Sequence, residues 1–457
     1  MATTITQHPL YDILPVGQDI IFGISNTSIV AHQVKVKFIA EVHISQLAPP
    51  SLSTSTDIVG TFKTTPNNAG IGMFDFSSIV ESFVKSDHIA GQLSQYKGTI
   101  VSATIDPKIP LHIIDKGSLN TNIIRYLGIK FKVEYLNTTT NQIVVDSSTA
   151  NSGSFKIFNG YIKHNDALDI INDNFGYDIS RFNLSLGGTD KFLTNTPVTQ
   201  YANMEDYGTM AWLDPNFNLD SIYFIFYDAA GIQIGAQTYY PSLLQLSDLR
   251  WQLIYFGCYP ANLQGWSSTF QALVALGTVT HYTIRAYDNT AAPLTAEYTI
   301  NINCPNLKSY VPIRLAWLNQ WGAWDYYTFT QKSVRSLSTK GSTYTQQSGT
   351  WNESIYSIKG YKGGEKSFRR NATERIKMNT NFVNESESEW FEELINSPEV
   401  YILEGFQTDS ANPLLNNYVT PVRLTTSSYI RKTVANDRLM QYTFEIEKSK
   451  TLRTQAV

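Results

Sequence analysis

Charged side chains are scarce in this sequence. Asp, Glu, Lys and Arg make up 16 % of the 457 residues, against roughly a quarter in an average soluble protein. The 35 Lys and Arg stand against 39 Asp and Glu, which leaves a net charge of −4. A chain without a basic excess cannot hold nucleic acid by bulk charge alone. The aromatic content of 13 % excludes a disordered chain.

Cysteines and long apolar runs are also few. Cys258 and Cys304 are the only cysteines, too few for a disulfide framework. Two reduced thiols are expected for a chain made in a cytosol, with a single bridge as the alternative. The first residues lack the basic and apolar regions of a secretory signal. The most apolar run, 222–227, falls far short of the roughly 18 residues that a membrane span needs, so no membrane segment is expected.

Sequence patterns typical of catalytic and cofactor sites are missing. The seven histidines are scattered singly, without metal-ligand spacing. Neither a G-x-S-x-G elbow nor a G-x-x-x-x-G-K-[ST] phosphate loop occurs. We therefore expect no enzyme activity, no cofactor and no metal. One enzymatic alternative stays open, a polysaccharide depolymerase using Asp325 or a glutamate of 385–393, because paired carboxylates can come from anywhere in a chain.

The patterns that are present predict a mainly β protein. We expect tandem β-sandwich-like domains over residues 1–150 and 151–305, followed by a C-terminal α+β assembly domain over 306–457. In the first domain, 34–44 alternates between apolar and mostly polar residues, as a half-buried strand does. Asp75 is expected to cap a short helix with an apolar stripe of Ile79, Val80, Phe83 and Val84. Strands are expected at 98–105 and 127–136, with a hairpin turn at 137–141.

The later segments predict hairpins and one clear helix. Strand pairs are expected at 221–228 with 232–239, and at 279–287 with 294–302. Asn384 and Glu387 fit a capping box for a helix whose apolar face holds Trp390, Phe391, Leu394 and Ile395. Further strands are expected at 313–318, 324–330, 400–403, 419–424 and 440–446, with a turn at 319–323.

Two clusters of opposite charge follow one another in the C-terminal domain. The basic stretch 359–377 includes Arg369 and Arg370, and the acidic stretch 385–393 includes Glu387 and Glu392. Such patches can pair across neighbouring copies of a ring. Two solvated faces are the alternative, and the basic stretch could also face nucleic acid.

The segment 304–329 is the most distinctive in the chain. It resembles a motif of virion structural proteins of short-tailed bacteriophages, especially the crAss-like phages. The run Phe192-Leu-Thr-Asn-Thr-Pro and the N-terminal run from Pro15 to Ile44 are similar to the same proteins. In such phages, proteins of this size form stacked rings or the hub between portal and tail tip. No catalytic or metal residue is implied, because the family is structural.

The resemblance and the composition lead to one expectation. The chain is expected to be a virion tail protein, assembled in the host bacterial cytoplasm, that forms a homo-oligomeric ring around the DNA channel. Its partners would be other copies and other tail and portal-associated proteins, with non-specific proximity to channel DNA. A receptor- or glycan-binding tail protein is the alternative. The candidate interface side chains are Trp317, Asn319, Trp321, Trp324, Asp325, Tyr326, Tyr327, Arg369, Arg370, Glu387 and Glu392.

Overall fold

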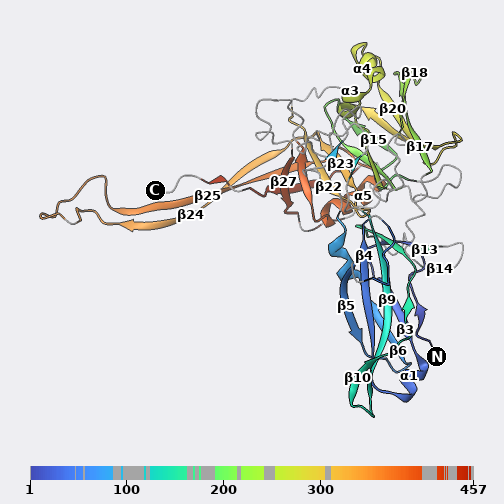
Figure 1. The fold of residues 1–457 in the computed structure, drawn as a ribbon. Coiled ribbons are helices and arrows are strands. Elements are labelled where there is room, and N and C mark those ends of the chain that lie inside the picture. Colours follow the sequence, from blue (N-terminus) through green and yellow to red (C-terminus); the bar gives the residue numbers. More distant parts are fainter. Residues whose placement is uncertain are drawn as a thin grey trace. The chain divides into compact units, whose positions relative to one another are not determined.

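A computed structural model describes most of the chain, and its strands far outnumber its helices (Figure 1). The described residues are 2–46, 48–54, 57–85, 94–95, 118–119, 124–161, 168–169, 174–175, 191–213, 218–240, 253–303, 310–351, 353–403, 419–426, 428, 430, 440–450 and 452–453. The expected mainly β class is confirmed. The chain divides into two compact units, Met1–Cys304 with Asn319–Asp325 and Pro305–Leu318 with Tyr326–Val457. The boundary expected at 150 stays a prediction.

The first part of the first unit is built from two sheets. One has the strand order β1-β3-β6, and the other the order β2-β12-β9-β4-β5, with β10 and β11 also paired to β9. The strands are β1 (Thr4–Gln7), β2 (Ile13–Pro15), β3 (Ile21–Ser25), β4 (Val34–Ser45), β5 (Ile58–Thr64), β6 (Ile71–Asp75), β9 (Ile124–Asn137), β10 (Gln142–Val145), β11 (Ala150–Asn151) and β12 (Phe155–Phe158). The helices are α1 (Thr27–His32), α2 (Ser77–Val80) and the 3-10 turn Glu81–Phe83.

A phenylalanine-rich core lies between these two sheets. The Phe22 ring from β3 lies 5.7 Å from the Phe131 ring of β9, measured between centroids, and 5.6 Å from the Phe155 ring of β12. Both sheets thus bury one face in a common core, which is a sandwich-like arrangement. The strand expected at 34–44 is confirmed as β4. His43, expected on its polar face, is nevertheless fully buried, and desolvation lowers the pKa of its imidazole.

The short helix expected after Asp75 is present with a different start. Phe76 is its N-cap, because Asp75 is the last residue of β6. The Asp75 carboxylate still acts at the helix start, since Oδ1 accepts hydrogen bonds from Ser77 N at 3.0 Å and from Ile20 N at 3.1 Å. The expected strand at 98–105 lies outside the described residues.

The rest of the first unit carries a second large sheet of order β15-β21-β20-β17-β18 and the pair β16-β19. The strands are β15 (Thr199–Ala202), β16 (Thr209–Leu213), β17 (Leu219–Tyr227), β18 (Gln233–Tyr239), β19 (Leu253–Gly257), β20 (His281–Asp288) and β21 (Tyr298–Ile302). Two short two-stranded sheets are also present: β7 (Ser94–Gln95) pairs with β8 (Ser118–Leu119), and β13 (Leu168–Asp169) pairs with β14 (Asn174–Phe175). Both expected hairpins are confirmed. The helices α3 (Pro260–Trp266) and α4 (Ser268–Ala275) were not expected, although Pro260 at a first helical turn and Ser267 as N-cap are recognisable start signals.

The second unit contains one eight-stranded sheet and a helix. The sheet has the order β23-β22-β26-β27-β28-β25-β24, with β29 also paired to β25. The strands are β22 (Ile313–Leu318), β23 (Trp324–Phe329), β24 (Val334–Gln346), β25 (Gly364–Asn379), β26 (Val400–Leu403), β27 (Val419–Leu424), β28 (Thr443–Lys448) and β29 (Leu452–Arg453), and the helix is α5 (Glu385–Asn396). The first two residues of β23, Trp324 and Asp325, are assigned to the first unit. Side chains of α5 pack on the sheet in one apolar core.

Within the described part of the chain, no helix is both long and apolar enough to cross a membrane.

Candidate interaction surface

The aromatic segment around 317–327 is core material in the structure. Trp317, Trp321, Trp324 and Tyr326 are all buried, and Tyr327 is half-buried. The Trp317 ring lies 4.9 Å from the Trp390 ring of α5, measured between centroids. Burial also raises the pKa of the Tyr327 phenol, which keeps it neutral. These side chains therefore hold the chain itself together, and a role for them in contacts with another chain stays a prediction.

A buried polar network closes the turn of this segment. Asn319 Oδ1 accepts hydrogen bonds from the backbone N–H groups of Trp321 and Ala323, both at 3.0 Å. Gly322 occupies the left-handed region with φ of 75°, a conformation that a side chain would strain. The expected turn at 319–323 is confirmed, and the Asn319 side chain supplies the bonds that the buried backbone needs.

The same network joins this turn to the run Phe192-Leu-Thr-Asn-Thr-Pro. Thr194 Oγ1 donates to Asp325 Oδ1 at 2.7 Å, and Asn319 Nδ2 donates to Leu193 O at 2.9 Å. Asn319 Nδ2 also donates to Asp325 Oδ1 at 3.0 Å. Thr194, Asn319 and Asp325 all belong to the first unit and are all buried. A buried carboxylate is tolerated because donors surround it, and its charge adds to the burial that raises the pKa of Tyr298.

Glu387 acts as a helix cap. Asn384 Oδ1 accepts from Glu387 N at 2.9 Å, while Glu387 Oε2 accepts from Asn384 N at 2.9 Å. The predicted capping box is confirmed. Burial raises the pKa of Glu387 against the opposing effect of the hydrogen bond from Asn384. Glu392 is half-buried on the same helix.

Arg369 and Arg370 lie on a long two-stranded ribbon formed by β24 and β25. The pairing runs from Val334 with Lys377 to Gln346 with Gly364. The pairs of β25 with β28 and β29 involve only residues 371–379, so 364–370 pair with β24 alone among the described residues. Figure 1 shows the ribbon leaving the sheet of its unit. We call residues 341–370 the arm.

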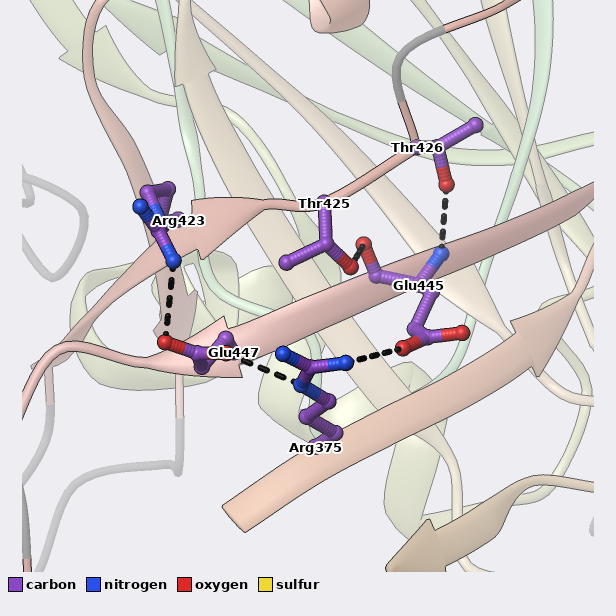
Figure 2. Close-up of polar contacts among 6 residues, drawn as sticks. All are labelled: Arg375, Arg423, Thr425, Thr426, Glu445 and Glu447. Carbon is purple, nitrogen blue, oxygen red and sulfur yellow. Dashed lines mark hydrogen bonds and ion pairs between the residues drawn. The ribbon is translucent and has the colours of Figure 1, made fainter. Parts of the chain in front are cut away.

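Ion pairs connect the ribbon to the sheet at the end where β25 pairs with β28. Figure 2 shows Arg375 between two glutamates of β28: its Nε lies 2.9 Å from Glu447 Oε2, and its Nη1 lies 3.8 Å from Glu445 Oε1. Arg423 Nη2 reaches Glu447 Oε1 at 3.0 Å. The hydrogen bond from Arg375, with the charge of Arg423, lowers the pKa of Glu447. These pairs connect three neighbouring strands and give the arm a fixed base.

Sequence reasoning missed the most conspicuous part of the arm, its end. Five large hydrophobic side chains are between 68 and 77 % exposed there: Trp351, Ile355, Tyr356, Ile358 and Tyr361. We call these five residues the apolar tip. Exposed hydrophobic residues gathered in this way mark interaction sites more often than scattered ones do. The sequence carries no signal of this exposure, because large apolar residues ordinarily predict a core.

The end of the arm has a defined fold. Thr350 N donates to Ser357 O at 3.0 Å, and Lys359 N donates to Ser348 O at 3.1 Å. The Tyr356 ring lies over Gly349, where an added Cβ would be only 2.0 Å from Cε2 of that ring. The apolar tip is therefore presented by a hydrogen-bonded turn, which limits the ordering cost of binding.

Comparison with known proteins assigns no family. No family model matches, and no curated protein matches. Among solved structures, invasin, a bacterial integrin-binding protein, aligns with 82 % of this chain at 7 % identity and a TM-score of 0.22. The alignment spans 56 % of the invasin chain. A likeness this low carries no inference about function.

Proposed function

We propose that this chain is a structural, non-enzymatic component of a bacteriophage tail, similar to those of crAss-like short-tailed phages. In this proposal it forms a closed homo-oligomeric ring or hub between portal and tail tip, around the DNA channel. It would be assembled in the host cytoplasm and reside in the virion, in contact with other tail and portal-associated proteins. The motifs at 192–197 and 304–329 are the basis for naming a phage tail.

The arm is the observation that carries an assembly role. Every residue of β24 from Val334 to Thr343 is exposed, so this strand has no buried face of its own. A two-stranded ribbon is only marginally stable by itself, because it has no core of its own. Surfaces that are exposed in one chain and rich in aromatic residues are the ones that protein interfaces cover. An element of this kind fits a protein whose contacts are made with other chains.

A receptor- or glycan-binding tail protein is the second candidate. The exposed rings of Trp351, Tyr356 and Tyr361 favour it, because aromatic rings at a surface can stack on sugar faces. It predicts binding to host polysaccharide that is lost in Trp351→Ala.

The test is the assembly state of the full chain. Mass photometry over a concentration series, with negative-stain microscopy, should find closed rings of one size. A chain that stays monomeric at every concentration, and binds host polysaccharide through Trp351, would overturn the ring and favour the alternative. Release of shortened polysaccharide chains would instead show a depolymerase and overturn the non-enzymatic part.

A further inference from the structure

We propose that the apolar tip docks on a second copy of this chain, on a surface outside that copy's arm. The inference rests on the proposed ring and names the contact that would build it. Its basis is the exposure of the tip, the charge of the arm and the chemistry of the side chains around the tip.

The positive charge of the arm favours contact with a negatively charged surface. The arm, residues 341–370, carries five Lys and Arg and two Glu, a net charge of +3. Because the whole chain carries −4, the remaining residues carry −7. Two arms would repel one another, whereas an arm and the remainder of a second copy attract. The contact is thus between two different surfaces, and repetition of such a contact closes a ring when the rotation fits.

The make-up of the tip favours a protein over a membrane. Glu353 is exposed at the same turn, between Trp351 and Ile355 in sequence. Inserting the turn into a bilayer would carry that carboxylate toward the apolar interior, where charge is strongly disfavoured. A protein surface can instead meet it with a basic or hydrogen-bonding group at the rim of the contact.

The tip also favours a protein over nucleic acid. Ile355 and Ile358 are about as exposed as the aromatic members, and an aliphatic side chain has no ring to stack on a base. Such side chains gain most from an apolar pocket that excludes water. Trp and Tyr beside them are the residue types most enriched at the energetic centres of protein interfaces.

The experiment compares two triple variants of the full chain by mass photometry and sedimentation velocity. The tip variant is Trp351→Ser, Ile355→Ser and Ile358→Ser. The control variant is Ile143→Ser, Ile232→Ser and Leu276→Ser, three hydrophobic side chains of the first unit that are 62 to 68 % exposed for the isoleucines and 73 % for the leucine. Circular dichroism and melting curves should be unchanged in both, since all six side chains are exposed.

We expect the tip variant to weaken self-association by at least about tenfold, as loss of interface anchors does, and the control to leave it unchanged. Raising the salt concentration should weaken association of the wild type, because charge attraction contributes. Rings that persist unchanged in the tip variant would overturn the tip contact and leave the ring proposal standing. A wild-type chain that is monomeric at every concentration would overturn both.

The docking surface is tested by cross-linking. With photoreactive benzoylphenylalanine in place of Tyr356, mixed isotope-labelled copies should give cross-links between the arm of one copy and residues outside 341–370 of another. Arm-to-arm cross-links would contradict the proposed partner surface. Tip-dependent flotation with phosphatidylglycerol vesicles, or tip-dependent retention of double-stranded DNA, would overturn the choice of a protein partner.

Discussion

Thr194 donates a hydrogen bond to Asp325 at 2.7 Å, although the two residues are 131 positions apart in the chain. Thr194 lies in the run Phe192-Leu-Thr-Asn-Thr-Pro, and Asp325 lies in the aromatic segment 317–327. Both side chains are buried, so the Asp325 carboxylate is not exposed to a polysaccharide in solution. The relation makes these segments parts of one buried network in the first unit.

Removal of the Asp325 carboxylate should destabilise the fold. Asp325→Ala leaves the hydroxyl of Thr194 and one amide hydrogen of Asn319 without their acceptor, at a cost of about 2–4 kcal/mol in the free energy of unfolding. Asp288→Ala is the matched control, because Asp288 accepts from Thr290 N and Ala292 N in an exposed turn. Urea denaturation should give a clearly larger loss for Asp325→Ala, and equal losses would contradict the buried network.

Trp317 should be essential for packing in the second unit. Its side chain is fully buried, and Trp317→Ala removes an indole that contacts Trp390, at a cost of about 3–5 kcal/mol. The indole N–H has no hydrogen-bond partner among the described residues. Trp317→Phe should therefore cost much less, since it removes an unsatisfied donor while keeping a ring. Thermal unfolding measures the loss of stability in Trp317→Ala and in Trp317→Phe. Trp351→Ala at the exposed tip is the control, and it should change the free energy of unfolding by less than about 0.5 kcal/mol.

Glu387 should reduce stability when it is charged. Its folded-state pKa is raised by burial, so ionisation costs more in the folded than in the unfolded chain. Stability then falls as pH rises from the ordinary value of 4.5 through the raised folded pKa, and it stays lower above that range. Glu387→Gln keeps an oxygen for Asn384 N and should equal or exceed the wild type in melting temperature at neutral pH. Asn384→Ala, which removes the cap itself, should cost about 1 kcal/mol.

One result for Glu387→Gln would contradict the prediction that the charge of Glu387 reduces stability. A loss of stability at neutral pH as large as that of Asn384→Ala would mean that the charge of Glu387 contributes to the cap. Melting temperatures of both variants across acidic to neutral pH separate the two cases.

Glu447 should show the opposite pH dependence. The hydrogen bond from Arg375 lowers its folded-state pKa, so its contribution is present above the ordinary value of 4.5 and is lost as pH falls through the lowered folded pKa. The melting temperature of Glu447→Gln should therefore lie below that of the wild type at neutral pH and meet it at strongly acidic pH. Glu353→Gln at the arm tip is the control, and a constant gap at all pH values would contradict the role of the ion pair.

Shortening the arm should leave the fold intact. Lys340 and Asn371 are cross-strand partners, so an Asn-Gly turn can join them after deletion of 341–370. The core residues of the second unit lie outside the deleted range, and the melting temperature should stay near that of the wild type. A large drop would show that the arm stabilises its own chain and would remove the argument that it exists for other chains.

Local signals in the sequence were enough for several elements. Asn384 with Glu387 predicted the start of α5, because a capping box acts between residues three apart. The turn at 319–323 and the hairpin of β17 with β18 were also predicted, since turn residues act within a few positions. Mainly β structure followed from alternation along strands such as β4.

The ribbon of β24 and β25 left no such signal. A strand with both faces in water has no apolar face, so the period of two that marks a half-buried strand is missing from Val334 to Thr343. The basic residues of 359–377 are visible in the sequence, but their place on a two-stranded arm is not. The exposure of Trp351 and Ile355 is likewise invisible in sequence, where such residues predict a core.

The sequence by itself determined that this chain is a mainly β protein and where helix α5 starts. These properties follow from residues close together in the chain. Only the tertiary structure decided which aromatic residues are core and which are surface, because burial depends on contacts between distant segments. It placed Trp317 and Asp325 inside and the apolar tip outside, and it thereby moved the candidate surface from the aromatic motif to the arm.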